Sequence, residues 1–132
     1  MRYLLDTHTW IWWYLSPEKL SKKAIATISN SKCYEGLLLS AISIWELCKL
    51  VEKGRLAISY DTEELIKKAL EMPGLTLVPL TPAIALKSTT LPQPLHNDPA
   101  DQIIVATARE ENATLITADK RLIDYKHIKT LW

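Results

Sequence analysis

Four acidic residues, far apart along the sequence, have the types and positions to do chemistry together: Asp6, Glu46, Asp101 and Asp119. Asp6 and Asp119 each follow a short apolar run typical of a buried strand, whereas the other two lie in or near the first turns of predicted helices. In an open parallel sheet, the strand ends and the helix starts that follow them share one edge, which is where ligands bind. We therefore expect the four carboxylates to meet at that edge.

Each of these acids also has an ordinary structural interpretation when it is taken alone. Asp6 and Asp119 can cap the helices that follow them, and residues 43–46 have the form of a capping box. Residues 98–101 form a strong helix start, with Asp98 at the N-cap and a proline at the first helical position. The combination of the four acids, and not any one of them, indicates a shared site.

Asp101 lies on an unexpected face of its predicted helix. It is spaced by three, four and seven residues from Ile104, Val105 and Ala108, so its carboxylate continues an apolar stripe, where an acid needs a partner or a cation. Converging carboxylates repel one another, and they take up protons or splay apart unless a cation neutralises them. Oxygen ligands favour Mg²⁺ or Mn²⁺ over zinc or copper. The acids therefore predict a carboxylate-held divalent ion of the kind that serves phosphate chemistry.

Five further side chains are candidates for supporting roles near the acids. Thr7 and Thr117 can orient a water or a carboxylate through their hydroxyls, although for Thr7 we favour the simpler interpretation of a β-branched residue at a strand end. His8 and His96 flank the acids, and we expect structural hydrogen bonds from them. Asp98 is a weaker candidate for metal contact, because its N-cap role is sufficient to explain it.

The elements that must position these residues alternate between strands and helices. Apolar runs predict strands at residues 3–5, 36–39, 75–78 and 114–117, with an edge strand at 127–129. Helical patterns cover residues 9–15, a stretch that opens at Pro17, and residues 41–53, 62–72, 82–89, 99–111 and 120–125. Continuous apolar strands between helices imply a parallel sheet covered on both faces. We expect one domain over residues 1–132, a three-layer α/β/α sandwich with a central parallel sheet of four to five strands.

Composition is consistent with a single well-packed domain. Hydrophobic residues make up 48% of the chain and the net charge is +1, so a core can form without disulfides and there is no highly charged tail. Cys33 and Cys48 lie in apolar, helix-like sequence, and we expect both to be reduced core thiols. The first apolar run is too short for a signal peptide and ends at an acid, and no stretch approaches the length of a membrane span. We therefore expect a cytoplasmic protein.

Four segments resemble the PIN-domain family in their order and spacing. They are residues 4–8 (Leu-Leu-Asp-Thr-His), 40–47 (ending in Trp-Glu-Leu), 96–102 (His-Asn-Asp-Pro-Ala-Asp-Gln) and 115–119 (Leu-Ile-Thr-Ala-Asp). No single motif is specific, but the ordered set of four is. Within the family, the chain resembles the VapC-type toxins of prokaryotic toxin–antitoxin pairs over essentially its whole length.

This resemblance implies an α/β/α fold and a metal-dependent endoribonuclease that hydrolyses RNA phosphodiester bonds. It implies Mg²⁺ or Mn²⁺, a homodimer, and a cognate antitoxin protein that blocks the site. It carries over the acidic cluster as catalytic residues and metal ligands: Asp6, Glu46, Asp101 and Asp119. The related toxins often carry arginine after the second aspartate of the third segment, where this chain has Gln102. That departure bears on the choice of substrate and partner, and not on the metal site.

Contacts to RNA are expected from basic and aromatic side chains near the acidic edge. Arg55 and Arg121 are the best candidates, because each follows an element near that edge. Trp10, Trp12 and Trp13 crowd one short helix and can stack on unpaired bases, but large aromatics more commonly fill a core or a dimer interface.

Two other classes of function are open on the residues alone. A phosphatase or receiver-like phosphoacceptor also uses clustered acids, but here the acids fall at the wrong elements for a receiver, and no strand-end lysine is evident. A PIN-like interaction module that has lost activity is the other alternative. The presence of all four acids argues against it.

Overall fold

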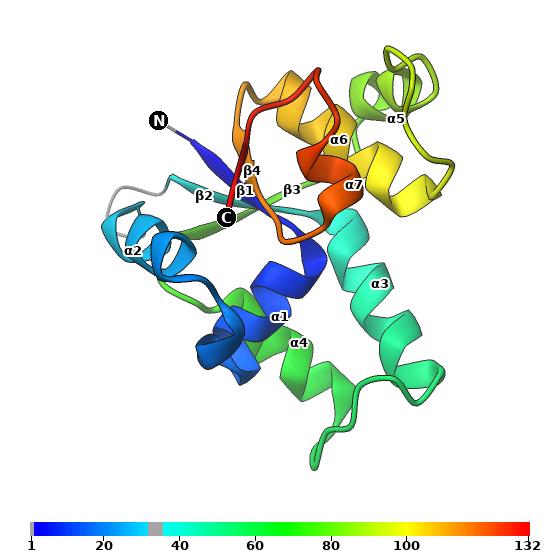
Figure 1. Cartoon of the computed structure of the whole chain (residues 1–132). Helices are drawn as coiled ribbons and strands as arrows, with labels where there is room; N and C mark the ends of the chain where they lie inside the picture. The colour runs from blue at the N-terminus through cyan, green and yellow to red at the C-terminus, as the bar shows by residue number, and fades with distance from the viewer. Residues whose placement is uncertain (1, 32–35) are drawn as a thin grey trace.

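Five parallel strands form the central sheet in the part of the chain that the structure, a computed structural model, describes, which is residues 2–31 and 36–132 (Figure 1). Their order across the sheet is β3-β2-β1-β4-β5. The bounds are Tyr3–Leu5 for β1, Leu37–Ser40 for β2, Leu75–Val78 for β3, Thr114–Ile116 for β4 and Thr130–Leu131 for β5. The predicted parallel sheet is thereby confirmed.

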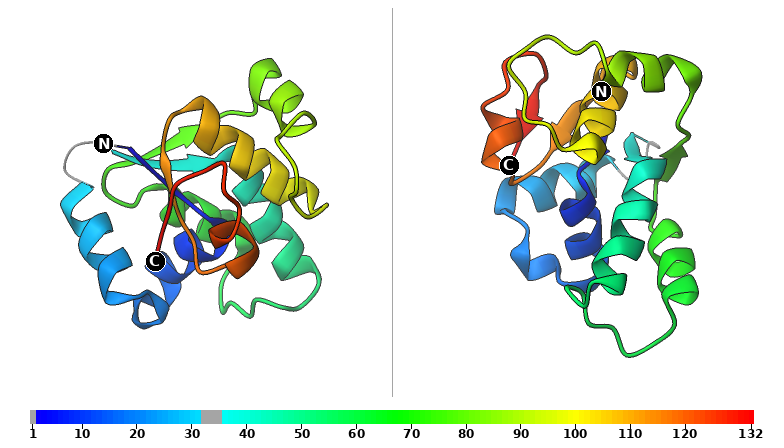
Figure 2. Two further views of the ribbon diagram at one scale, coloured as in Figure 1. Left: turned by 45° about the horizontal axis from the view of Figure 1, so that its top comes forward. Right: turned by 90° about the vertical axis from the view of Figure 1, so that its right-hand side faces the viewer.

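Helices cover both faces of this sheet. Their bounds are Thr7–Leu15 for α1, Lys22–Ser31 for α2, Ala41–Glu52 for α3, Thr62–Leu70 for α4, Pro82–Ser88 for α5, Pro99–Glu110 for α6 and Lys120–Ile123 for α7, with a 3₁₀ turn at Pro17–Lys19. Helices α1, α2 and α4 lie below the sheet and α5, α6 and α7 lie above it, while α3 flanks the sheet and contacts both α1 and α6 (Figures 1 and 2). The result is the three-layer sandwich that the sequence predicts.

The alternation of side chains along the strands decides which core each residue joins. Leu4 and its register partners Leu38 and Leu115 face the layer of α5, α6 and α7. Their neighbours Leu5 and Leu39 face the opposite layer, which contains α1 and α4. Because both faces are covered, consecutive residues of these central strands can be apolar, as the three leucines at 37–39 show.

The connectivity creates a crevice beside β1. From β1 the chain moves outward to β2 and β3, then returns to place β4 against the other side of β1. The direction of winding therefore reverses between β1 and β4, and in open parallel sheets ligands bind at the carboxyl ends of the strands at such a point. Asp6 follows β1 directly, and Thr117 follows β4 directly.

Two predicted elements differ in the structure. The helix expected from Pro17 divides into a 3₁₀ turn and α2, because the Ser21 hydroxyl caps a new helix by accepting the Ala24 N–H at 3.0 Å. The edge strand expected at 127–129 lies at Thr130–Leu131 instead. Ile128 packs against the core, and pairing with β4 begins only where the Leu115 N–H reaches the Lys129 carbonyl.

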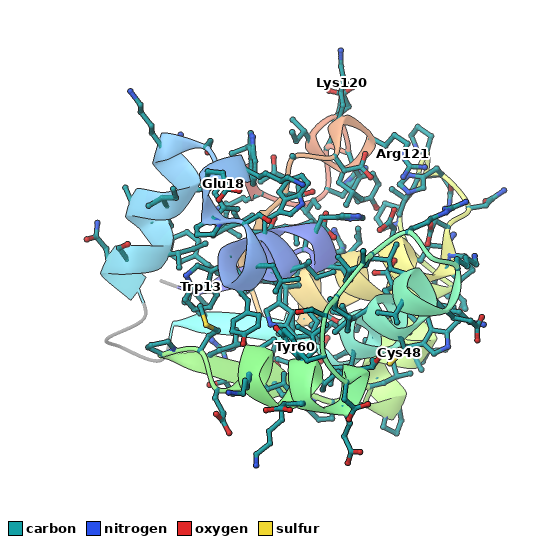
Figure 3. All side chains as sticks on the ribbon, turned by 90° about the horizontal axis from the view of Figure 1, so that it is seen from below. Trp13, Glu18, Cys48, Tyr60, Lys120 and Arg121 are labelled. Carbon is teal, nitrogen blue, oxygen red and sulfur yellow. The ribbon has the colours of Figure 1, made fainter. Side chains whose placement is uncertain are left out.

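One alternative interpretation and one prediction are wrong in α3. The N-cap of this helix is Ser40, whose hydroxyl accepts the Ile42 N–H at 3.2 Å, so residues 43–46 are not a capping box. Cys48 is exposed and not a core thiol, because Leu47 is the fully buried residue at this level of the helix and Cys48 falls on the other side (Figure 3). Cys33 lies outside the described residues. No helix in the described part of the chain is long and apolar enough to cross a membrane.

Candidate active site

A cleft of about 360 Å³ opens at the carboxyl ends of β1 and β4, and all four predicted acids line it. Its other lining residues are Thr7, His8, Trp12, Asp98, Ala118 and Arg121. The acids come from four elements: the end of β1, the second turn of α3, the first turn of α6 and the N-cap of α7. The fold therefore brings together side chains that are up to 113 residues apart, which follows from their numbers.

Asp6 is held between the two central strands. Its Oδ1 accepts the Thr7 N–H at 2.8 Å, which caps α1, and its Oδ2 accepts the Thr117 hydroxyl at 2.7 Å. Only 7% of Asp6 is exposed. Burial raises the pKa of this carboxyl, and the charge of Asp101 adds to the rise, while the Thr117 hydrogen bond opposes it.

Thr117 joins two of the acids. Its Oγ1 donates to Asp6 and also accepts the Asp119 N–H at 3.0 Å, and the residue is fully buried. The strand-end hydroxyl thus fixes Asp6 relative to the turn that carries Asp119. This is the orienting contact that we expected of Thr117.

Glu46 is half-buried and receives its hydrogen bond from Thr7. Thr7 Oγ1 lies 2.5 Å from Glu46 Oε1 and 2.8 Å from Ser43 Oγ. The Thr7 hydroxyl has one proton, so when Glu46 is ionised it donates to the carboxylate and accepts from Ser43. Burial raises the pKa of Glu46 to about 7, and repulsion from Asp101 and Asp6 contributes, while the Thr7 hydrogen bond lowers it. Thr7 therefore acts through its hydroxyl and is more than a β-branched strand-end residue.

Asp101 faces the cleft from α6 and is 7% exposed. Its Oδ2 lies 2.7 Å from His96 Nε2, and its backbone N–H donates to the N-cap carboxylate of Asp98 at 3.1 Å. Burial raises the pKa of Asp101, and the His96 hydrogen bond opposes that rise. The expected structural hydrogen bond of His96 is thus made to a carboxylate of the cluster, whereas His8 lines the cleft.

Asp119 has a different electrostatic environment from the other three acids. It caps α7 by accepting the Arg121 N–H at 2.9 Å, and the Arg121 guanidinium lies 2.9 Å from Oδ2 and 3.2 Å from Oδ1. These hydrogen bonds hold the pKa of Asp119 below its ordinary value. Arg121 also lies 3.6 Å from Asp101, whereas the neighbouring Lys120 extends away from the molecule (Figure 3).

The donors of this cleft fit a hydrated divalent cation. Among the described residues, no group of three or more acidic, histidine and cysteine side chains is already arranged to hold an ion directly. Asp6, Glu46 and Asp101 nevertheless have pKa values raised by burial and by one another's charges, and a cation relieves both effects. Mg²⁺ usually keeps several waters and takes only a few carboxylates, which suits oxygen ligands around an open cleft.

Sequence reasoning overlooked one partner and placed others only approximately. Ser43 was considered only as the start of a capping box, although its position one helical turn before Glu46 could have indicated its contact with Thr7 at the site. Arg55 lines a neighbouring hollow instead of the acidic cleft.

The three tryptophans of α1 have different environments. Trp10 is fully buried, and its Nε1 donates to the Ala69 carbonyl at 2.9 Å, as expected for a core residue. Trp12 is half-buried and lines the cleft, and Trp13 lies on the α2 side of α1 (Figure 3).

Comparison with known proteins identifies relatives along the whole chain. The PIN domain family matches residues 3–128. Ribonuclease VapC22 of Mycobacterium tuberculosis is 34% identical over 131 residues, which cover 98% of this chain and 97% of that protein.

Solved structures show the same fold at lower sequence identity. The structure of VapBC2 from Rickettsia felis bound to a promoter DNA fragment contains a chain with a TM-score of 0.72 and 15% identity, covering 99% of this chain and 98% of that one. The structure of FitAcB from Neisseria gonorrhoeae contains a chain with a TM-score of 0.68 and 20% identity, covering 98% and 96%. A chain in a toxin–antitoxin complex from Klebsiella pneumoniae has a TM-score of 0.66 and 20% identity over similar shares of 98% and 96%.

Proposed function

Because the chain belongs to the PIN-domain family, we propose that it is a metal-dependent endoribonuclease and the toxin of a toxin–antitoxin pair. The observation that carries this proposal is the convergence of three desolvated carboxylates, Asp6, Glu46 and Asp101, in one cleft at the switch point of the sheet. Burying acids that raise one another's pKa values lowers the stability of the fold. The binding of a divalent cation would offset that loss and would explain why the acids are gathered at one site.

The side chains of the cleft have distinct proposed roles. A Mg²⁺ or Mn²⁺ ion held in the cleft would supply a water of lowered pKa as nucleophile and would neutralise charge on the phosphate and the leaving oxygen. The ion would be held by three carboxylates, each of which is oriented by one neighbour: Asp6 by Thr117, Glu46 by Thr7 and Asp101 by His96. Asp119 completes the acidic set as the fourth proposed ligand, while Asp98 supports Asp101 from the N-cap of α6.

Arg121 is the proposed contact to the RNA backbone at this cleft. Its guanidinium is exposed and lies beside Asp119 and Asp101, so it can reach a phosphate while remaining near the acids. A planar guanidinium binds phosphate oxygens through paired hydrogen bonds. Because a metal-activated water would be the nucleophile, the reaction needs no nucleophilic side chain.

The partners of the relatives extend the proposal. One relative carries the name ribonuclease, and one similar structure is a toxin–antitoxin complex. By analogy we propose RNA as the substrate, a cognate antitoxin that covers the acidic cleft, a homodimer, and action in the cytoplasm.

The proposal is tested with purified chain and a fluorescent single-stranded RNA, with Mg²⁺ or Mn²⁺ and with EDTA. We expect Asp6→Asn and Glu46→Gln to abolish metal-dependent cleavage while their circular dichroism spectra remain those of the wild type. The matched control is Glu63→Gln, which changes an exposed acid on α4 outside the cleft. Wild-type cleavage by either cleft variant in a clean preparation contradicts the assignment.

A second measurement separates an enzyme from an inert interaction module. Calorimetric titration with Mn²⁺ should show binding that Asp6→Asn and Asp101→Asn weaken. An inert module has no reason to keep a divalent site, so absence of binding by the wild type favours that alternative.

A further inference from the structure

A second hollow adjoins the acidic cleft. Its volume is about 560 Å³, and it lies between α1 and the loop that joins α3 to α4, with Lys19 of the 3₁₀ turn at its rim. His8 and Trp12 line both the hollow and the cleft, so the two spaces adjoin at these side chains. Figure 3 shows the loop passing close to α1, with Tyr60 just before α4.

The charge of the hollow is opposite to that of the cleft. The cleft holds five carboxylates and one arginine among its lining residues, whereas the hollow is lined by Lys19, Arg55 and His8 and by no acid among the described residues. Lys19 and Arg55 are exposed, and neither forms an ion pair with an acid in the described part of the chain. A ligand that spans both spaces therefore carries negative charge where it meets this rim.

The walls of the hollow are apolar and aromatic. Trp12 is half-buried, with its ring centroid 5.7 Å from that of His8 and 6.0 Å from that of Trp132, so its neighbours hold it in place. Leu56 and Ile58 continue the wall, and Tyr60 is 37% exposed at the loop end. A volume of this size is in the usual range for a site that encloses a small organic group.

We propose that this hollow is a nucleotide subsite of the acidic cleft, which holds an unpaired RNA nucleotide next to the scissile phosphate. The base packs against Trp12, and a flanking phosphate lies between Lys19 and Arg55. Aromatic walls with basic rims are how proteins bind single strands without reading their sequence. The subsite rests on the proposed nuclease function, and it accounts for Arg55, which lies outside the cleft itself.

A polypeptide is the alternative occupant, and charge argues against it here. A peptide does not need a continuous run of negative charge, whereas a phosphodiester chain places one charge at every step. The phosphodiester chain can therefore bind the basic rim with one phosphate and the metal-loaded acidic cleft with the next. The experiment below distinguishes the two occupants, because only an RNA strand makes RNA turnover depend on the rim.

The experiment compares two substrates across salt concentrations. One is a short single-stranded RNA of mixed sequence, and the other is bis(p-nitrophenyl) phosphate, a small diester that reaches the acids without filling the hollow. For Lys19→Ala and Arg55→Ala we expect KM for RNA to rise, and the slope of log affinity against log salt to fall by about 0.7 for each lost phosphate contact. In both variants, turnover of RNA should also fall relative to turnover of the small diester. The matched control is Lys53→Ala, an exposed lysine of the same loop outside the hollow.

The aromatic wall is tested by a pair of substitutions. Trp12→Leu should lower kcat/KM for RNA by roughly five- to hundredfold, which is the usual range for losing one stacked base, whereas Trp12→Phe should restore most of it. Thermal melts establish that both variants fold. Photocrosslinking with 4-thiouridine RNA gives a readout that does not depend on turnover, and we expect crosslinked peptides from residues 8–19 or 55–60.

The outcomes separate the subsite from the nuclease function. If the wild type cleaves RNA but Lys19→Ala and Arg55→Ala match the Lys53→Ala control in KM and salt slope, the subsite is wrong and the nuclease function stands. The subsite is also wrong if Trp12→Leu and Trp12→Phe lose kcat/KM for RNA equally, or if the crosslinks are confined to other surfaces. If the wild type hydrolyses neither substrate with Mg²⁺ or Mn²⁺, the nuclease function itself fails.

Discussion

The hydroxyl of Thr7 controls how easily Glu46 ionises, and Thr7→Val measures that control. Thr7 is 2% exposed, so valine can take its place while removing the donor that lies 2.5 Å from Glu46 Oε1. A hydrogen bond to a charged group contributes about 1.5–3 kcal/mol, and about 1.4 kcal/mol corresponds to one pH unit. Because Glu46 is only half-buried, we take the lower end of that range. The pKa of Glu46, about 7 in the wild type, should rise to about 8.

Carbon-13 NMR of the chain labelled in its glutamate carboxyls gives this pKa directly in EDTA, with Glu46→Gln to assign the resonance. Thr7→Ser is the control, because serine keeps the hydroxyl and should leave the pKa near 7. At neutral pH the ionised fraction should fall from about one half to about one tenth, so Mn²⁺ affinity should weaken by about fivefold. Two results would contradict this role of Thr7. One is a pKa of Glu46 that stays at its wild-type value in folded Thr7→Val, and the other is a pKa that rises equally in Thr7→Ser.

Three further predictions concern stability and the cleft arginine. Without metal, the chain should melt at a higher temperature near about pH 5.5 than near about pH 8, because the raised pKa values of Asp6, Glu46 and Asp101 let the folded state keep protons that the unfolded state releases. Saturating Mn²⁺ at the higher pH should remove the difference, and a melting temperature that rises with pH across this window would contradict the argument. Arg121→Ala should return the pKa of Asp119 toward its ordinary value. Because the arginine no longer competes with the metal for Asp119, Mn²⁺ binding should strengthen by up to about fivefold in calorimetry, while RNA binding weakens. An unchanged Mn²⁺ affinity would count against competition between the arginine and the metal. Leu38→Ala should lower the free energy of unfolding by about 2–5 kcal/mol in urea titrations, because Leu38 is 1% exposed in β2, which is paired on both sides. A loss below about 1 kcal/mol would show that the site collapses around the cavity.

Three of the acids have raised pKa values, and the fourth, Asp119, does not. The depressed pKa of Asp119 has the opposite sign, because its ion pair with Arg121 stabilises the fold above the unfolded pKa and is lost only in acid. The arginine of that pair is 59% exposed, so the pair contributes little to stability. The stability profile between mild acid and neutrality should therefore follow the desolvated trio.

Local patterns in the sequence were sufficient to predict most elements of the fold. Continuous apolar runs indicated β1 to β4, and the alternation of such strands with helices indicated a parallel sheet covered on both faces. Asp98 followed by proline indicated the start of α6, and its carboxylate does accept the Asp101 N–H. Where two local signals competed, the prediction failed: the hydroxyl of Ser21 divides the helix expected from Pro17.

The convergence of the acids at one edge also followed from the sequence, because strand ends and helix starts share an edge in any parallel sheet. Their individual environments did not follow. Thr7 meets Glu46 across 39 residues and Thr117 meets Asp6 across 111, and both contacts exist because β1 lies between β2 and β4.

The sequence by itself determined the elements, their order and the presence of an acidic edge, because the period of apolar residues and the helix caps are properties of neighbouring positions. Only the tertiary structure decided which carboxylates are desolvated, that Arg121 pairs with Asp119, and that Cys48 faces outward. These depend on the order of strands and on which side of each helix the rest of the chain covers, and long-range packing sets both.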